Sequence, residues 1–303
     1  MAWVKAENDR TSAVLEKSAH FAVLQAEALK VLESPDRIAF PNFNAGFIYN
    51  KWEDAEHARG IVRRTSLEDY LKPDPKRTTV LDYDALAKAD HRSWVGEGFV
   101  CLGPETELCL ASLSAGGEDA QTLREFNMKT GAFVENGFTL PSGKQNVSWI
   151  DKETLLVARN WGLGTMSESG YPIDMRMWKR GRPFESAQPL FHGDAQDNDG
   201  VPSDIYTDSQ GHRAIILARG PDIQTHGFSI LLASGVNKLP IPRKSNRGGP
   251  VHARKFAGRL EEFHKPFYYD EITEGGHGSG ADNTQRAHTF AATFTYLMMK
   301  LMD

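Results

Sequence analysis

The spacing of the hydrophobic positions changes twice along the chain, and each change marks a predicted change of architecture. Between Val14 and Leu32, apolar residues recur mainly at three- and four-residue steps, and Pro35 ends the run. This period is that of an amphipathic helix. We therefore expect residues 1–36 to form a helical arm that packs one apolar face on a neighbouring part of the molecule.

From residue 37 to residue 242, the apolar positions fall into short runs typical of strands. Turn-forming residues separate the runs, for example Ala115-Gly116-Gly117 and Lys129-Thr130-Gly131. The runs cover residues 47–49, 60–64, 79–81, 108–113, 147–150, 154–158 and 214–217. Their spacing is that of four-stranded propeller blades of about 40–50 residues, which predicts a partial β-propeller of roughly four or five blades. Pattern alone leaves a barrel or a sandwich open.

After residue 243, the pattern becomes helix, strand, glycine-rich loop and helix, which is typical of α/β domains. A helical stripe runs from Ala253 to Phe263, and aromatic residues follow at 267–269. The loop Glu274-Gly275-Gly276-His277-Gly278 then leads to a helix that begins near Asp282. The predicted fold class is therefore mainly β with an α/β tail, and the tail comprises residues 243–303.

Composition narrows the possible partners. The chain has 25% charged and 40% hydrophobic residues and a net charge of -5 without a basic tract, which argues against a nucleic-acid partner. No apolar stretch is long enough to span a bilayer, and the first residues lack the apolar core of a secretory signal. We therefore expect a cytoplasmic protein with no membrane partner. Cys101 and Cys109 have no His or Cys companions at ligand spacing, so we expect two buried, inert thiols, no metal site and no cofactor.

His277 is the strongest candidate for catalytic chemistry. Glycines at 275, 276 and 278 let the backbone turn tightly and leave the imidazole uncovered, as a general base requires. In α/β-hydrolases the triad follows the order Ser, Asp or Glu, and His along the chain, with the histidine on such a late loop.

Several runs resemble the prolyl oligopeptidase family of serine peptidases, in its bacterial branch. The matching runs include Trp3-Val4-Lys5-Ala6-Glu7-Asn8, Trp52-Glu53-Asp54-Ala55-Glu56-His57, Ser148-Trp149-Ile150-Asp151, Val251-His252-Ala253-Arg254-Lys255-Phe256 and Glu274-Gly275-Gly276-His277-Gly278. The resemblance implies a helical arm (1–36), a propeller that screens access (37–242), and the C-terminal end of an α/β-hydrolase catalytic domain (243–303). It also implies hydrolysis of short peptides, with Arg247 holding the substrate.

The departures from the family pattern argue against activity. The chain has no Gly-x-Ser-x-Gly nucleophile turn, and Ser279 has His277 where that pattern requires a glycine. Ser245-Asn246-Arg247 stands where the family has Asp-Asp-Arg, and no Asp or Glu occurs from residue 223 to residue 260. We therefore expect an internally truncated, inactive peptidase. The alternative is a non-catalytic propeller binding module, or a truncated product with no function.

Two other clusters have simpler interpretations. Asp54 and Glu56 beside His57 resemble an acid/base group, but a structural hydrogen-bond role is expected inside a strand region. The acidic loop from His192 to Asp199 misses the calcium-loop spacing, so a solvated turn is expected. The tryptophans are expected to be blade core, namely Trp52, Trp94, Trp149, Trp161 and Trp178.

Overall fold

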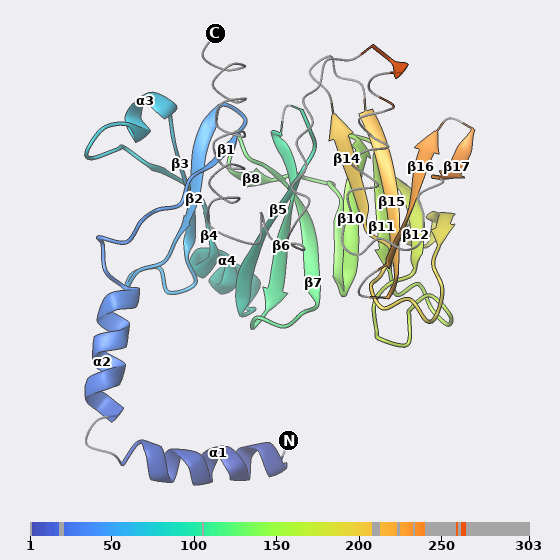
Figure 1. Cartoon of the computed structure of the whole chain (residues 1–303). Coiled ribbons are helices and arrows are strands. Elements are labelled where there is room, and N and C mark those ends of the chain that lie inside the picture. The colour runs from blue at the N-terminus through green and yellow to red at the C-terminus, as the bar shows by residue number, and fades with distance from the viewer. Residues whose placement is uncertain are drawn as a thin grey trace, which may run out of the picture.

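The computed structural model of the chain places two helices before the sheets. It describes residues 2–17, 21–104, 106–207, 213–222, 225–232, 234–239, 259 and 262–264. Helices α1 (Ala2–Leu15) and α2 (Phe21–Leu32) extend away from the β structure (Figure 1). No residue of α2 is buried, and Val31 is 67% exposed. The helices predicted for this segment are thus present, but the prediction that they bury an apolar face is wrong for α2 in the described structure, because an apolar stripe does not by itself supply a partner.

The strands form four antiparallel sheets that follow one another along the chain. The first sheet contains β1 (Asn42–Asn44), β2 (Phe47–Trp52), β3 (Ile61–Thr65) and β4 (Thr78–Asp82). Helix α3 (Leu67–Tyr70) lies between β3 and β4 in sequence, and α4 (Tyr83–Asp90) follows β4. The second sheet contains β5 (Trp94–Cys101), β6 (Leu108–Ala115), β7 (Gln121–Asn127) and β8 (Ala132–Phe133), and β9 (Thr139–Gly143) also pairs with β7.

The third and fourth sheets repeat the same up-and-down order. The third contains β10 (Gln145–Asp151), β11 (Thr154–Arg159), β12 (Asp174–Lys179) and β13 (Gln188–His192), with a 3₁₀ helix at Phe184–Ser186. The fourth contains β14 (Ser203–Thr207), β15 (Arg213–Asp222), β16 (Thr225–Leu232) and β17 (Gly235–Lys238). Each strand run predicted from the sequence coincides with one of these strands, except that the run 60–64 begins one residue before β3.

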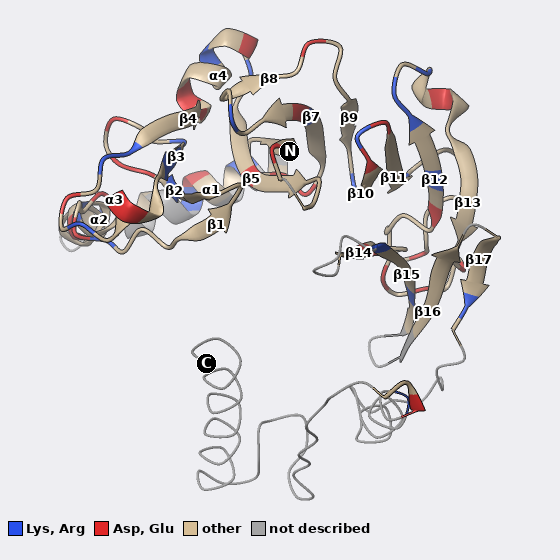
Figure 2. Ribbon diagram, turned by 90° about the horizontal axis from the view of Figure 1, so that it is seen from above, with Lys and Arg blue, Asp and Glu red and all other residues tan. Residues whose placement is uncertain are grey.

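The four sheets are arranged as blades on an arc (Figure 2). The first strand of each sheet, namely β1, β5, β10 and β14, lies on the concave side of the arc, and the later strands lie further out. Among the described residues this is the architecture of four consecutive propeller blades, as the sequence predicted.

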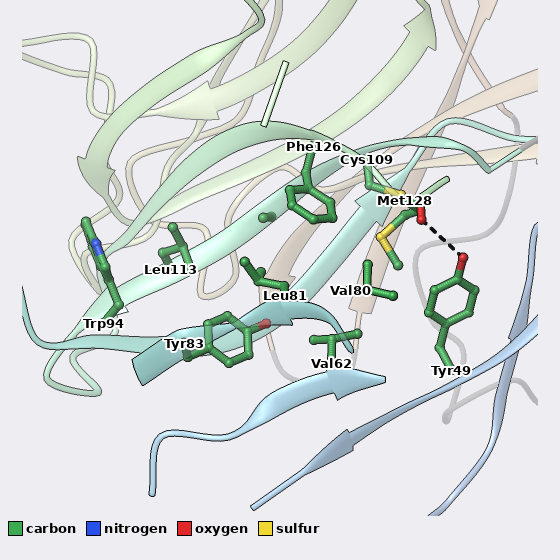
Figure 3. Packing of buried hydrophobic residues seen from close by; sticks show 11 residues of the cluster. Tyr49, Val62, Val80, Leu81, Tyr83, Trp94, Cys109, Leu113, Phe126 and Met128 are labelled. Atoms are coloured by element: carbon green, nitrogen blue, oxygen red, sulfur yellow. Dashed lines mark hydrogen bonds between the residues drawn. The ribbon is translucent and has the colours of Figure 1, made fainter. Parts of the chain in front are cut away.

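The hydrophobic core consists of three clusters, each between two successive blades. Tyr83, Leu113 and Phe126 belong to the cluster between blades one and two, which Figure 3 shows. Leu155 and Trp178 belong to the second cluster, and the third is centred on Leu156, Ala158, Met175, Val201 and Leu217. The blades are therefore stabilised by contacts between neighbours, as in other repeat architectures.

The tryptophans divide by their position in the blades. Trp94, Trp149 and Trp178 are 4%, 2% and 8% exposed, which confirms them as blade core. Trp52 and Trp161 are only half-buried. Trp52 carries two guanidinium groups on its ring, with Arg37 at 4.7 Å and Arg63 at 4.3 Å from its centroid. These cation–π contacts stabilise the half-buried ring.

Arginine side chains connect each pair of neighbouring blades. Arg64 donates to the carbonyl oxygens of Met128 and Lys129 at 2.8 and 2.9 Å, which links blade one to blade two. Arg180 of the third blade forms a bidentate pair with Glu125 of the second. Arg213 of the fourth blade donates to the carbonyl oxygens of Trp149 and Ile150 in the third. These bonds add directional contacts to the apolar packing.

The two cysteines form a disulfide bond, so the prediction of two free thiols is wrong. Cys101 ends β5, and Cys109 stands directly opposite it on β6. Only eight positions separate them in sequence, and the hairpin brings them into register. The prediction followed from the expected reducing compartment rather than from pairing. Because disulfides persist mainly in oxidising compartments, the bond also weighs against the predicted cytoplasmic location.

Reduction of this disulfide is expected to lower the free energy of unfolding by about 2–3 kcal/mol, because the bond restricts the unfolded chain. Urea unfolding with and without dithiothreitol measures the difference. A double variant with Cys101→Ala and Cys109→Ala serves as the control, because reductant should not change its midpoint. Two free thiols in protein isolated under alkylating conditions would contradict the bond.

Candidate functional site

The residues that the sequence singled out for catalysis cannot be placed. His277 and Arg247, with the whole glycine-rich loop, lie outside the described residues. Their roles therefore stay predictions.

Asp54 and His57 form a close pair in the turn between β2 and β3. His57 Nδ1 lies 2.8 Å from Asp54 Oδ1, and the same oxygen accepts the backbone N–H groups of Glu56 and His57 at 3.0 and 2.8 Å. The hydrogen bond with Asp54 raises the pKa of His57. Burial raises the pKa of Asp54, but the bonds from His57, Trp52 and Glu56 outweigh burial and leave that pKa lowered. These contacts close one turn, which supports the structural role predicted for the cluster.

The acidic loop before β14 is built around a buried ion pair. Asp197 is 1% exposed and accepts hydrogen bonds from Arg219 of β15, the shortest at 2.6 Å. It also accepts the backbone N–H of Asp194 at 2.8 Å. The prediction of a solvated turn is therefore wrong for Asp197, because its partner lies 22 residues further along the chain. In the described ranges, no group of three or more His, Cys, Asp or Glu side chains could hold a metal ion.

A cavity of about 480 Å³ lies between the first two blades. Its volume is within the usual range of about 300–1,000 Å³ for small-molecule sites. The inner strands β1 and β5 line it, together with parts of β2 and β3 and the start of α4. The lining residues include Asn42, Asn44, Lys51, Tyr83, Glu97 and Phe99. This mixture of aromatic surface and a few polar groups is typical of a binding site.

Tyr83 is the most unusual residue of this cavity. Its side chain is 1% exposed, and Figure 3 shows it among the buried residues between the blades. Its neighbour Tyr49 donates a hydrogen bond to the carbonyl oxygen of Met128 at 3.5 Å. In the described part of the chain, the Tyr83 hydroxyl makes no such bond. Burial, with the charge of Glu97, raises the pKa of Tyr83, so the phenol stays protonated and is able to donate.

Charged groups lie at the same cavity. Lys51 Nζ donates to the carbonyl oxygen of Gly96 at 3.4 Å and pairs with Glu53 at 2.9 Å. Ser114 donates to Glu97 at 3.0 Å. Lys51 is thus paired with Glu53, whereas Glu97 keeps its negative charge and accepts a hydrogen bond from a neutral hydroxyl.

Sequence reasoning did not find this cavity. Its residues come from strands up to 60 positions apart, and none belongs to a recognisable motif. The only local signal is Asn42-Phe43-Asn44, where strand alternation places two amides on one face of β1.

Four antiparallel blades with their first strands on a common concave surface define a β-propeller domain. The family model of the prolyl oligopeptidase N-terminal beta-propeller domain matches residues 1–219. The chain therefore belongs to the prolyl oligopeptidase family, and the match covers its N-terminal part.

Two curated relatives are bacterial peptidases. The chain is 44% identical over 198 residues to the protein named uncharacterized peptidase y4nA of Sinorhizobium fredii, a match that covers 65% of this chain and 27% of the relative. It is 26% identical over 197 residues to uncharacterized peptidase RP174 of Rickettsia prowazekii, covering 62% of this chain and 27% of the relative. The matched part thus spans about a quarter of the length of these relatives.

Solved structures share the fold. A post-proline cleaving enzyme from Rickettsia typhi superposes with a TM-score of 0.73 at 24% identity, covering 80% of this chain and 37% of that chain. Oligopeptidase B from Leishmania major gives 0.58 at 14% identity, with coverage of 80% and 33%. These likenesses confirm the mainly-β propeller predicted from the sequence. None of the described helices is long and apolar enough to cross a membrane.

Proposed function

We propose that this chain is a non-hydrolytic, peptide-binding propeller unit of a prolyl-oligopeptidase-type serine peptidase. One observation carries the proposal: a sequence whose first 219 residues match the family's propeller contains no Gly-x-Ser-x-Gly turn. Peptide hydrolysis by this family's chemistry needs a serine hydroxyl exposed on such a turn.

The proposed inactivity follows from what an isolated histidine can do. An imidazole at His277 could accept a proton, but acyl transfer also needs a nucleophile and a carboxylate that orients and stabilises the charged ring. In a serine-peptidase triad, loss of the carboxylate alone lowers the turnover number about 10⁴-fold. With Ser245-Asn246 before Arg247, the chain offers neither group at the expected positions. Arg247 would then hold a substrate that nothing attacks.

The proposed organisation keeps the predicted boundaries. Residues 1–36 are the helical arm, 37–242 the partial propeller, and 243–303 a C-terminal remnant of the α/β-hydrolase domain. An internal block, with further blades and most of the hydrolase sheet, is proposed to be missing between them. Short peptides are the proposed ligands, without cofactor, nucleic acid or membrane. The proposed location is the cytoplasm, and the Cys101–Cys109 disulfide is the observation that opposes it.

The test combines turnover, labelling and binding on the full chain. We expect no hydrolysis of the chromogenic peptide succinyl-Ala-Ala-Pro-p-nitroanilide and no covalent adduct with a proline diphenyl phosphonate. We also expect saturable binding of a fluorescein-labelled heptapeptide, Ala-Gly-Phe-Pro-Leu-Ala-Gly, measured by fluorescence polarisation. Hydrolysis that disappears in His277→Ala would overturn the proposed inactivity, and lack of any peptide binding would favour a product without function.

A further inference from the structure

We propose that the cavity between β1 and β5 is a peptide subsite that holds one apolar side chain of an extended peptide, while the Tyr83 hydroxyl donates a hydrogen bond to the peptide main chain. The proposal rests on the proposed function, because it takes the ligand to be a peptide. It assigns that ligand to one place on the propeller.

The unused hydroxyl of Tyr83 is the first argument. Among the described residues, the fully buried side-chain atoms without a hydrogen-bond partner are Arg63 Nε, Thr65 Oγ1 and Arg213 Nε, so the Tyr83 oxygen is not sealed off and can reach a ligand in the cavity. The side chain is 1% exposed and lines the cavity, and within the described residues its oxygen has no partner. A protonated phenol needs an acceptor, and a peptide carbonyl is one.

The position of β1 is the second argument. Among the described strands it is the edge of its sheet, with β2 on one of its two backbone edges. It also lies on the concave side of the arc (Figure 2). Extended peptides bind to such edges through main-chain hydrogen bonds, while pockets for alternate side chains provide selectivity. Asn42 lines the cavity from this strand and supplies an amide beside the edge, and Asn44, whose Nδ2 already donates to the Thr106 carbonyl oxygen, adds its amide oxygen as an acceptor.

The cavity wall defines the side chain that fits. Phe99, Met128 and Val62 provide apolar surface, and Phe99 stacks on Phe126 with the ring centroids 5.7 Å apart. Lys51 is already paired with Glu53, and Glu97 keeps its negative charge while it accepts a hydrogen bond from Ser114. A carboxylate on the ligand would meet a paired lysine and the carboxylate of Glu97, so an aromatic or aliphatic side chain is favoured over an acidic one.

Tyr83→Phe is the sharpest variant because it removes only the hydroxyl. Binding of the labelled heptapeptide Ala-Gly-Phe-Pro-Leu-Ala-Gly is expected to weaken about fivefold, the effect of one hydrogen bond. The thermal midpoint of the ligand-free protein is expected to stay unchanged, because the hydroxyl makes no bond there. Tyr206→Phe is the matched control: this tyrosine is 62% exposed on β14, so binding should not change. Phe99→Ala should weaken binding more than Tyr83→Phe.

A second measurement needs no variant. A heptapeptide with p-azidophenylalanine in place of its phenylalanine should crosslink under light to residues of β1 or β5, located by mass spectrometry. Equal binding by wild type, Tyr83→Phe and Phe99→Ala, or crosslinks confined to other blades, would overturn the subsite and leave the proposed peptide-binding function standing. Absence of peptide binding by the wild type would overturn both.

Discussion

Replacement of Glu125 by leucine is expected to lower the free energy of unfolding by about 3 kcal/mol, because it removes the bidentate partner of a largely buried guanidinium. The Glu125 carboxylate is buried and accepts two hydrogen bonds from Arg180, at 2.8 and 2.9 Å, across the junction between blades two and three. It also accepts the backbone N–H of Phe138 at 2.7 Å. The variant therefore takes away the bidentate partner of Arg180, which keeps the Lys152 carbonyl oxygen and Glu153 at 3.6 Å, and it leaves the Phe138 N–H without its acceptor. Urea unfolding followed by tryptophan fluorescence measures the loss.

Glu107→Leu is the matched control for Glu125→Leu. Glu107 pairs with Lys129 at 3.2 Å, but both side chains are largely exposed, and such surface pairs contribute only about 0–1 kcal/mol. A double variant, Glu125→Leu with Arg180→Met, should recover much of the loss, because apolar replacement of both partners removes the buried charge. Equal losses in Glu125→Leu and Glu107→Leu would show that the blade junction does not depend on this pair.

The strands could be predicted because they carry local information. In residues 108–113 and 154–158, short β-branched and aliphatic runs are bounded by turn residues, and both runs form central strands of their sheets. The turns could also be predicted from the sequence. Gly116 and Gly131 have φ of 71° and 68°, which other residues rarely adopt. The order of strands in each blade followed from these signals, since consecutive strands pair in a meander.

Contacts between blades could not be predicted from the same pattern. Arg180 and Glu125 are 55 positions apart, and neither stands in a motif that marks it as one of a pair. The disulfide was missed for a related reason: residue spacing does not show that Cys101 and Cys109 face one another in register. The candidate cavity depends on the packing of one blade on the next, so it became visible only with the three-dimensional structure. His277 and Arg247, in contrast, were predicted from a motif and from the family resemblance, but they lie outside the described residues.

Gly96→Ala is expected to lower the free energy of unfolding by about 3 kcal/mol, at the upper end of the usual cost of overpacking. Gly96 lies on β5 directly against the ring of Tyr83, and a Cβ built there would be 2.0 Å from Tyr83 Cζ. The Tyr83 ring is buried and belongs to the cluster between the first two blades, so moving it away from Gly96 breaks its packing contacts there. A methyl group at this position must displace the ring, and with it the packing of α4 and β5.

Gly227→Ala on β16 separates this clash from the general effect of adding a methyl group to a strand glycine. There the nearest atom to the new Cβ would be Arg219 Cγ at 3.4 Å, an ordinary contact, so the stability should change little. The decisive measurement is a double-mutant cycle with Tyr83→Leu, which removes the colliding end of the ring. If the clash causes the loss, Gly96→Ala should cost much less in the Tyr83→Leu background than in the wild type. An equal cost in both backgrounds would mean that Gly96 is needed for its backbone and not for the space it leaves to the ring.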